Sequence, residues 1–343
     1  MDRIAFRVDA SSEVGLGHLS RCLALAGSLR RVGATCHFVG NTDMQPWAGS
    51  VETAGHRLSL IDSGGQDSDA AQTAQALASG GRVDWLVVDH YRLDAQWHDR
   101  IRPAARRLLA IDDLADRPLT VDAVLDPSPC ASESDYQSVA NRGCKLLLGP
   151  RYCLLRQQFA QARTSQTWPA DGAHRIHLAL GGTDAAGHTA PLAARLLAWF
   201  EEARLVAVLG SPGPQTQALA ALGEQFPDRL EVVLATDEMA KTMMGCTVAV
   251  GAPGGFLWER FCMGLPSACV ITSANQQPVV EKLAQGGWLL NLGDAADFAT
   301  TARMPLQAWL HALGARQAQR EFLMAQVDGQ GAERVAAWMM EPA

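Results

Sequence analysis

Short apolar runs alternate with amphipathic stretches along the first half of the chain. Runs rich in β-branched residues and Leu lie at 4–8, 35–39, 57–61, 85–88, 108–111 and 123–125. Between them, the segments 18–31, 69–78 and 94–105 carry apolar residues at three- and four-residue spacing. The short runs are typical of parallel strands, and the longer spacing is typical of helices. The alternation predicts a doubly wound, Rossmann-like sheet.

The same pattern restarts in the second half, after an apolar run at 145–148 and a polar stretch. The second set of apolar runs lies at 176–182, 205–209, 231–234, 247–250, 268–271 and 288–292, and helices are expected from 305 onward. We therefore predict an N-terminal domain over 1–155, a linker over 156–172 and a C-terminal domain over 173–343. Two such domains are the layout of the GT-B fold, an α/β fold. Its two Rossmann-like parallel-sheet domains face each other across a cleft, with ligand at the carboxyl ends of the strands.

Length and composition agree with two globular domains. The chain has 343 residues, 48% of them hydrophobic and 19% charged. That length exceeds one core of ordinary size, and that composition is typical of a folded protein. The net charge of −7, without a dense Lys/Arg block, argues against a nucleic-acid partner.

The cysteines and the N-terminus bear on the compartment. Eight cysteines in a chain of this size do not read as a disulfide framework, and none forms a C-x-x-C zinc pattern. Residues 4–9 lack the pattern of a signal peptide, and no apolar run reaches membrane-spanning length. We expect a cytoplasmic monomer without a membrane span, metal or cofactor.

A glycine-bearing loop separates the first predicted strand from the first predicted helix, where Gly15 and Gly17 precede His18. Glycines let the backbone approach a ligand closely, and a helix start offers free N–H groups to an anion. The third glycine of the dinucleotide fingerprint is missing, which disfavours NAD. His18 is a candidate general base; the alternative is a capping or packing histidine.

Two further segments place polar residues where strands are predicted to end. Asp89-His90-Tyr91 follows an apolar run, and its side chains could contact a sugar or hold His18 in one tautomer; the alternative is a capping aspartate. Asp112-Asp113 lacks a third acidic ligand at readable spacing. We expect a structural turn with substrate hydroxyl contacts there rather than a metal site.

The second half repeats the combination of a strand, a glycine loop and a helix. Gly181-Gly182-Thr183 and Gly254-Gly255 can bring backbone amides close to a diphosphate. Glu259 is a candidate acceptor for the ribose hydroxyls, with a solvated helix carboxylate as the alternative. Asn275-Gln276 offers amides to a sugar, unless Asn275 only caps a helix.

Taken together, these segments resemble the UDP-sugar hydrolases of pseudaminic acid biosynthesis, which are relatives of the MurG-like GT-B glycosyltransferases. The order and the spacing of the motifs both agree with the family. The matching motifs are Arg7-Val8-Asp9-Ala10-Ser11, Gly15-x-Gly17-His18 with Arg21-Cys22, Asp89-His90-Tyr91, Asp112 to Arg117, Gly181-Gly182-Thr183-Asp184, Trp258-Glu259-Arg260 with Gly264-Leu265-Pro266, and Asn275-Gln276.

The resemblance implies an activity and a division of roles. A metal-independent, inverting hydrolysis would convert UDP-2,4-diacetamido-2,4,6-trideoxy-β-L-altropyranose to UDP and free sugar, with His18 as the general base on water. Near Asp237 to Met239, the backbone would read the uracil. The expected substrate-binding residues are Asp9, Gly17, Asp89, Tyr91, Gly182, Thr183, Met239, Gly254, Gly255, Glu259, Asn275 and Gln276.

One departure from the family concerns the diphosphate loop. Where relatives carry small hydroxyl residues after the glycine, this chain reads Gly254-Gly255-Phe256-Leu257, and Pro253 lacks an N–H donor. Either the diphosphate is held more loosely or the ligand differs. Two alternatives to the hydrolase remain: a GT-B glycosyltransferase that uses a UDP-sugar donor, and a nucleotide-sugar-binding protein without turnover.

Overall fold

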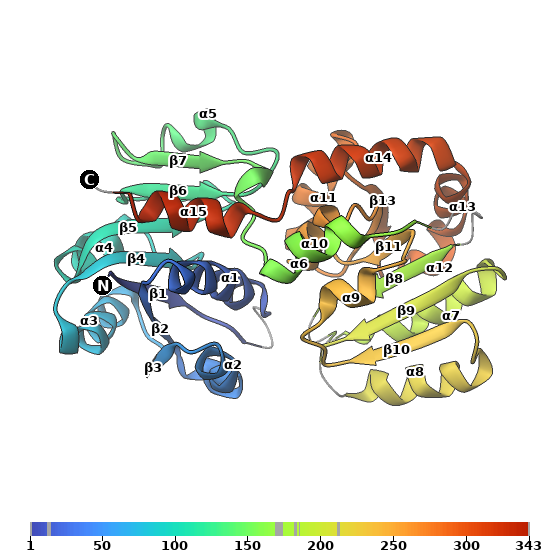
Figure 1. The fold of residues 1–343 in the computed structure, drawn as a ribbon, viewed down its shortest axis with the longest axis horizontal. Helices are drawn as coiled ribbons and strands as arrows, with labels where there is room; N and C mark the ends of the chain where they lie inside the picture. The colour runs from blue at the N-terminus through green and yellow to red at the C-terminus, as the bar shows by residue number, and fades with distance from the viewer. Residues whose placement is uncertain are drawn as a thin grey trace. The chain divides into compact units, whose positions relative to one another are not determined.

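The computed structural model describes residues 2–11, 15–168, 174–181, 184, 186–210 and 213–341. The chain forms two compact units, which Figure 1 shows from blue to red along the sequence. Unit 1 comprises Met1–Arg156 and Gly329–Ala343, and unit 2 comprises Gln157–Asp328. Each unit has its own parallel sheet and its own core.

Unit 1 is built on a sheet of seven described strands in the order β3-β2-β1-β4-β5-β6-β7, all paired in parallel. The order runs outward in both directions from β1 and β4, so the sheet has a topological switch point between these two strands. Its elements are β1 (Arg3–Val8), α1 (Gly17–Arg31), β2 (Thr35–Asn41), η1 (Thr42–Trp47), α2 (Ala48–Thr53), β3 (Arg57–Ile61), α3 (Gln66–Leu77), η2 (Ala78–Gly80), β4 (Val83–Asp89), α4 (Ala95–Ile101), η3 (Arg102–Ala104), β5 (Ala105–Ile111), β6 (Ala123–Asp126), α5 (Glu133–Tyr136), β7 (Lys145–Leu148), η4 (Pro150–Tyr152) and α15 (Gly331–Met339).

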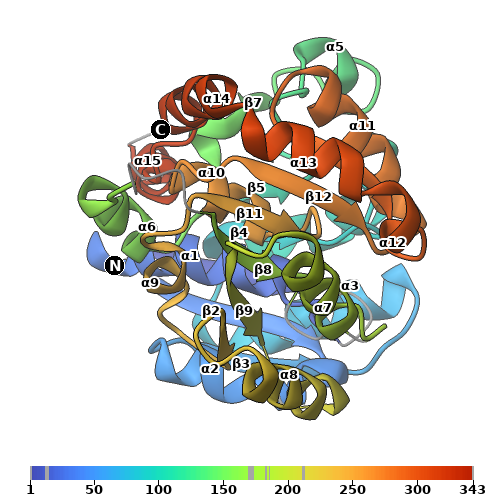
Figure 2. The ribbon, with the colours of Figure 1, turned by 90° about the vertical axis from the view of Figure 1, so that its right-hand side faces the viewer.

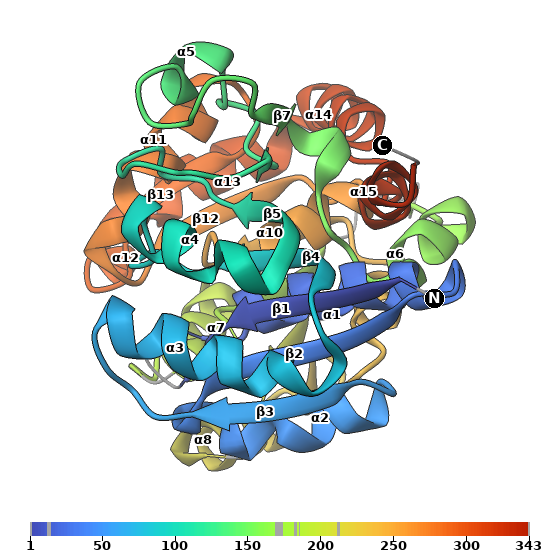
Figure 3. The same ribbon diagram turned by 90° about the vertical axis from the view of Figure 1, so that its left-hand side faces the viewer.

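Both faces of this sheet are covered by helices. Along β1, Phe6 packs with residues of α1 and α15 on one face, whereas Ala5 packs with residues of α3 and α4 on the other. Figure 3 shows α3 and α4 side by side over the strands. Burial on both faces explains why these strands read as continuous apolar runs rather than as alternating ones.

The last helix corrects the predicted domain boundaries. We expected the helices at the end of the chain to complete the second domain, but α15 packs on α1 in unit 1 (Figure 1). The indole N–H of Trp85 donates to the carbonyl of Met339 at 2.9 Å, and Arg31 pairs with Glu333 at 2.6 Å. The physical reason is that α15 supplies Val335 and its neighbours to an apolar face of the first sheet.

Unit 2 is built on six described strands in the order β10-β9-β8-β11-β12-β13, again all parallel. Its switch point lies between β8 and β11. Its elements are α6 (Gln157–Ala162), η5 (Arg163–Ser165), β8 (Arg175–Ala179), α7 (Thr189–Trp199), β9 (Arg204–Leu209), α8 (Pro214–Gln225), β10 (Leu230–Leu234), α9 (Met239–Met243), β11 (Val248–Gly251), α10 (Phe256–Cys262), β12 (Ser267–Ile271), η6 (Ala274–Gln276), α11 (Gln277–Gln285), β13 (Leu290–Asp294), α12 (Phe298–Thr301), α13 (Arg303–His311) and α14 (Leu313–Gln326).

Helices also pack on this second sheet. Figure 2 shows α7 with α8 and α12 as its neighbours, over β8 and β9. Residues Gln157–Ser165, expected to be part of a linker, form α6 and η5 and belong to unit 2. The α/β class with two Rossmann-like parallel sheets, predicted from the apolar runs, is confirmed.

Candidate active site

The switch point of unit 1 brings two predicted site segments together. The parallel register pairs Val8 of β1 with Asp89 of β4, so both chains leave the sheet at the same edge. The loop after β1 leads into α1, whose buried residues include His18, Cys22 and Leu25 at helical spacing. His18, in the first turn of α1, therefore lies where β4 ends.

His18 and Asp89 form a buried pair. His18 Nδ1 lies 2.5 Å from Asp89 Oδ1, and the two side chains are 11% and 1% exposed. A carboxylate oxygen can only accept a hydrogen bond, so Nδ1 carries the hydrogen. The neutral ring then presents its lone pair at Nε2, which is the atom that can take a proton. The sequence suggested that Asp89 could hold His18 in one tautomer, and this contact is the one that such a role requires.

Further donors keep Asp89 ionised. Arg21 Nε donates to Oδ2 at 2.6 Å and Arg21 Nη2 to Oδ1 at 2.6 Å, while the Cys22 thiol lies 3.5 Å from Oδ2. Burial alone would raise the pKa of Asp89, but the charge and hydrogen bonds of Arg21, together with His18, hold that pKa well below its usual value. The pair is thus a carboxylate that orients an imidazole.

Tyr91 covers the same imidazole. Its ring meets that of His18 edge-on, with centroids 4.8 Å apart, and its hydroxyl donates to Asp113 Oδ2 at 3.3 Å. Tyr91 is 39% exposed, so it has a face available to a ligand beside His18. Gly17, which precedes His18, is exposed too.

Asp9 is held inside unit 1 by its neighbours. Arg7 donates to both of its oxygens, at 2.5 and 3.2 Å, and the main-chain N–H of Asn41 donates to Oδ1 at 2.8 Å. His90 Nε2 lies 3.1 Å from Oδ2, and Arg7 also binds Asp69 of α3. These bonds hold β1 to β2 and α3. The observed contacts of Asp9 are therefore structural, and its contact with a substrate remains a prediction.

The acidic turn after β5 is held by hydrogen bonds. Asp112 Oδ1 accepts from Arg117 at 2.6 Å, and Oδ2 accepts from the Ala115 N–H at 2.8 Å. The Tyr136 hydroxyl lies 3.1 Å from Asp112 Oδ2 and 3.0 Å from Asp126 Oδ2. Asp112 is fully buried, so its side chain stabilises this turn and is not accessible to solvent.

Sequence reasoning missed Asp126 and Tyr136. Asp126 ends β6 and is 4% exposed, and burial raises the pKa of its carboxyl to about 7. The available signal was an apolar run that ends in an acidic residue, the same pattern that identified Asp89. Within the described residues, no cluster of three or more His, Cys, Asp or Glu side chains could hold a metal ion.

In unit 2, the strand ends carry the predicted glycine loops. Gly181 follows β8 with φ of 121°, in the region that favours glycine. Gly182 and Thr183 lie outside the described residues. Gly254 and Gly255 follow β11 and are exposed, so their amides are open to a ligand. Since β8 and β11 flank the switch point of this sheet, both loops lie at its carboxyl edge.

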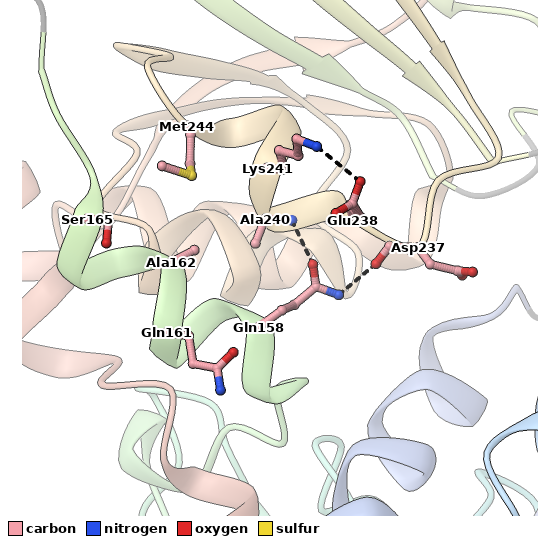
Figure 4. A pocket seen from close by; sticks show the side chains of 9 residues that line it. All are labelled: Gln158, Gln161, Ala162, Ser165, Asp237, Glu238, Ala240, Lys241 and Met244. Atoms are coloured by element: carbon pink, nitrogen blue, oxygen red, sulfur yellow. Dashed lines mark hydrogen bonds and ion pairs between the residues drawn. The ribbon is translucent and has the colours of Figure 1, made fainter.

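Met239 begins α9 and is buried, and the loop before it is held by α6. Gln158 Nε2 donates to the carbonyl of Asp237 at 2.7 Å, and its Oε1 accepts from the Ala240 N–H at 3.1 Å (Figure 4). An open cavity of about 580 Å³ lies against these elements. Its lining comprises Gln158, Gln161, Ala162, Ser165, Asp237, Glu238, Ala240, Lys241 and Met244.

The other predicted residues of unit 2 differ in exposure. Glu259, in α10, is 4% exposed, so the alternative of a solvated carboxylate is wrong. Asn275 is exposed and accepts from the Ser273 hydroxyl at 2.6 Å, without capping a helix through its side chain. Gln276 accepts from the Thr272 N–H at 2.9 Å, which closes the turn after β12.

Comparison with known proteins finds distant relatives of the chain. No family model matches the chain. The chain is 21% identical to the UDP-2,4-diacetamido-2,4,6-trideoxy-beta-L-altropyranose hydrolase of Campylobacter jejuni, over 83% of this chain and 97% of the relative. It is 21% identical to the uncharacterised protein MJ1062 of Methanocaldococcus jannaschii over 77% of this chain. A third relative, the spore coat polysaccharide biosynthesis protein SpsG of Bacillus subtilis, is 29% identical over 42% of this chain.

Coverage differs among these relatives. The matches span 54% of MJ1062 and 43% of SpsG, about half the length of each. Solved structures cover the chain more fully: the glycosyltransferase of kitacinnamycin has a TM-score of 0.65 at 16% identity over 98% of both chains. The MurG protein of Acinetobacter baumannii has a TM-score of 0.63 at 16% identity over 99% of both.

The fold is therefore that of the GT-B class, with two Rossmann-like parallel sheets. Within that class, the resemblance to the UDP-sugar hydrolases of pseudaminic acid biosynthesis is confirmed as a distant relationship. Among the helices that the structure describes, none is both long and apolar enough to cross a membrane.

Proposed function

We propose that the protein processes a nucleotide sugar. Specifically, it hydrolyses a UDP-linked 2,4-diacetamido-2,4,6-trideoxy sugar, the substrate class in the name of the Campylobacter relative, to UDP and the free sugar, as a step of nonulosonic acid biosynthesis. The observation that carries the proposal is the buried His18–Asp89 pair at the switch point of unit 1. A cytoplasmic setting fits the eight cysteines, all of which lie in the described residues and none of which forms a disulfide there.

His18 acts as the general base. Its Nε2 takes a proton from a water molecule while the water oxygen attacks the anomeric carbon from the face opposite UDP. The bond from that carbon to the diphosphate oxygen breaks, and its electron pair leaves with UDP, so the product has the inverted configuration. Asp89 stabilises the imidazolium that forms, because its carboxylate accepts the Nδ1–H at 2.5 Å. No step requires a metal ion.

Unit 2 holds the nucleotide. The amides of Gly254 and Gly255 donate to the diphosphate, and Gly182 and Thr183, which lie outside the described residues, remain predicted contacts. Glu259 accepts from the ribose hydroxyls, and the backbone at Met239 reads the uracil. In unit 1, Tyr91, which already contacts His18 edge-on, is a proposed sugar contact. In unit 2, the exposed amide of Asn275 and the side chain of Gln276 are proposed sugar contacts as well.

The diphosphate loop departs from that of the family. Pro253 has no N–H, and the residues after Gly254 carry no hydroxyl groups, so two or three donors of the usual loop are missing. Backbone donors remain at Gly254 and Gly255. We therefore expect UDP binding that depends on main-chain amides. Because this loop contacts the diphosphate, it does not select among the acyl groups of the sugar.

The decisive experiment is a proton NMR time course with the UDP-diacetamido sugar and the 343-residue chain. We expect UDP and free sugar, the latter appearing first as the anomer opposite to that of the donor. His18→Ala should lower kcat by about 10²–10⁴-fold with UDP affinity preserved. His37→Ala is the matched control, because His37 lies on β2 of the same unit and bonds Ser59 at 2.9 Å. Wild-type turnover by His18→Ala would refute the mechanism.

The second candidate is a GT-B glycosyltransferase, favoured by the folds of the kitacinnamycin enzyme and MurG. The same base would then deprotonate a hydroxyl acceptor instead of water. Turnover that begins only when a hydroxyl acceptor is added would support it. Saturable binding of the sugar nucleotide without turnover under any condition would favour a binding protein.

A further inference from the structure

Arg260 is a fully buried cation in α10. Its Nη2 donates to the carbonyl oxygen of Ala179 at 2.6 Å, and its Nη1 lies 3.4 Å from the carbonyl oxygen of Ala252. In the part of the chain that the structure describes, Nε has no hydrogen-bond partner and no carboxylate forms an ion pair with the guanidinium. Glu259 attracts it through space.

Burying such a charge is costly. Burial lowers the pKa of Arg260, yet a guanidinium stays protonated in proteins, so the positive charge is present in the folded unit. Buried charges are ordinarily paired, and an unpaired one disfavours the folded state. The position of Arg260 therefore calls for a reason other than stability.

The two carbonyls that Arg260 binds flank the switch point of unit 2. Ala179 ends β8 just before Gly181, and Ala252 follows β11 just before the Gly254 loop. Gly251 makes the approach possible: a Cβ there would collide with the Ala179 carbonyl and with the Arg260 guanidinium. Arg260 thus hydrogen-bonds to the main chain at Ala179 and Ala252, just before each of the two glycine loops.

We propose that Arg260 is a positioning residue for the diphosphate: it sets the two loops and supplies the positive charge that a bound diphosphate compensates. This inference rests on the proposed binding of a nucleotide diphosphate by unit 2. The two contributions are complementary. The loop amides donate neutral hydrogen bonds, and Arg260 supplies a positive charge next to a loop that lacks the usual hydroxyl donors. The bound diphosphate thus supplies the negative charge that the Arg260 guanidinium lacks within the described residues.

Unit 2 provides a matched control in Arg229. This arginine also binds main-chain carbonyls, those of Ala203, Leu197 and Phe200 at 2.7–3.1 Å. It precedes β10 and so lies at the amino edge of the same sheet, away from the glycine loops. A role in tying loops together is therefore shared by both arginines, whereas a diphosphate-specific effect is expected of Arg260 alone.

The test is calorimetric titration of the wild-type chain, Arg260→Met, Arg260→Lys and Arg229→Met with UDP and with uridine. Arg260→Met should weaken UDP binding by about 10–100-fold, because a nearby positive charge and the hydrogen bonds that position the loops are lost together, with uridine binding unchanged. Arg260→Lys should recover part of the loss, and Arg229→Met should bind both ligands as wild type does. Added UDP should raise the Tm of wild type more than that of Arg260→Met.

Each other outcome has a defined meaning. Equal UDP affinity of wild type and Arg260→Met would overturn the inference and leave the proposed function intact. A wild type that binds neither UDP nor uridine would overturn both. If Arg260→Met does not fold, Arg260→Gln replaces it, since the amide can still donate to the Ala179 carbonyl without a charge. Failure of both neutral variants to fold, beside a folded Arg260→Lys, would assign Arg260 to stability and reject the inference.

Discussion

Asp126 should make unit 1 less stable as the pH rises through neutrality. Its Oδ1 accepts from the Ser128 N–H at 2.8 Å, and its Oδ2 lies 3.0 Å from the Tyr136 hydroxyl, which also lies 3.1 Å from Asp112. One hydroxyl hydrogen serves only one carboxylate. Asp112 is ion-paired with Arg117, so a protonated Asp126 satisfies the arrangement by donating to the Tyr136 oxygen.

The magnitude follows from linkage. Burial raises the pKa of Asp126 from 3.8 to about 7 in the folded protein. Between these values the folded state binds more protons than the unfolded state, so the free energy of unfolding falls as the pH rises. The full penalty is about 4 kcal/mol, and about 3 kcal/mol of it develops between about pH 5 and pH 8. Above about pH 7 the carboxyl is ionised in both states and the loss levels off.

Asp126→Asn tests this reasoning, because an asparagine can keep the Ser128 contact and donate to Tyr136 without titrating. Urea unfolding of wild type and variant from pH 5 to pH 8 should show the variant losing about 3 kcal/mol less stability than wild type over that range. Asp99→Asn, an exposed carboxylate of α4, is the control and should follow wild type. Parallel pH profiles for wild type and Asp126→Asn would show that the carboxyl is not protonated in the folded protein.

Three further predictions concern the site and the fold. Asp89→Asn should lower kcat by about 10³–10⁴-fold while UDP affinity is retained, and a kcat within about ten-fold of wild type would contradict the orienting role of Asp89. Deleting residues 329–343 should unfold unit 1, because α15 covers its sheet and receives the Trp85 indole hydrogen bond; a native far-UV spectrum and unchanged protease resistance would contradict this. A chelator should leave turnover unchanged in the NMR assay, and a loss restored by Mg²⁺ would reject the metal-independent mechanism.

Much of the fold was predictable because its signals are local. The run 85–88 predicted β4, and the spacing within 18–31 predicted α1. Both predictions were possible because the apolar periodicity of strands and helices is visible over a few consecutive residues. The strand Lys145–Leu148 was not among the predicted ones, although it forms the edge of the sheet. Its apolar run was noted only as the segment before the predicted linker, because no helical spacing was recognised after it to complete the strand–helix alternation.

The candidate site was predictable only in outline. Apolar runs that end in polar residues identified Asp89 and the loop before His18, because the carboxyl ends of parallel strands share one edge of a sheet. The same pattern at Asp126 was overlooked. The close approach at Gly251 was not readable at all, since a glycine in a sequence does not reveal what lies against it.

The sequence by itself determined the class of fold, the order of most strands and helices, and the loops that bear polar residues. Only the tertiary structure decided which groups meet. Asp89 orients His18 from 71 positions away, Arg260 reaches a carbonyl 81 positions away, and α15 returns to the first unit. These outcomes depend on how sheets and helices pack across long separations, where burial and charge are set by neighbours in space rather than by neighbours in the chain.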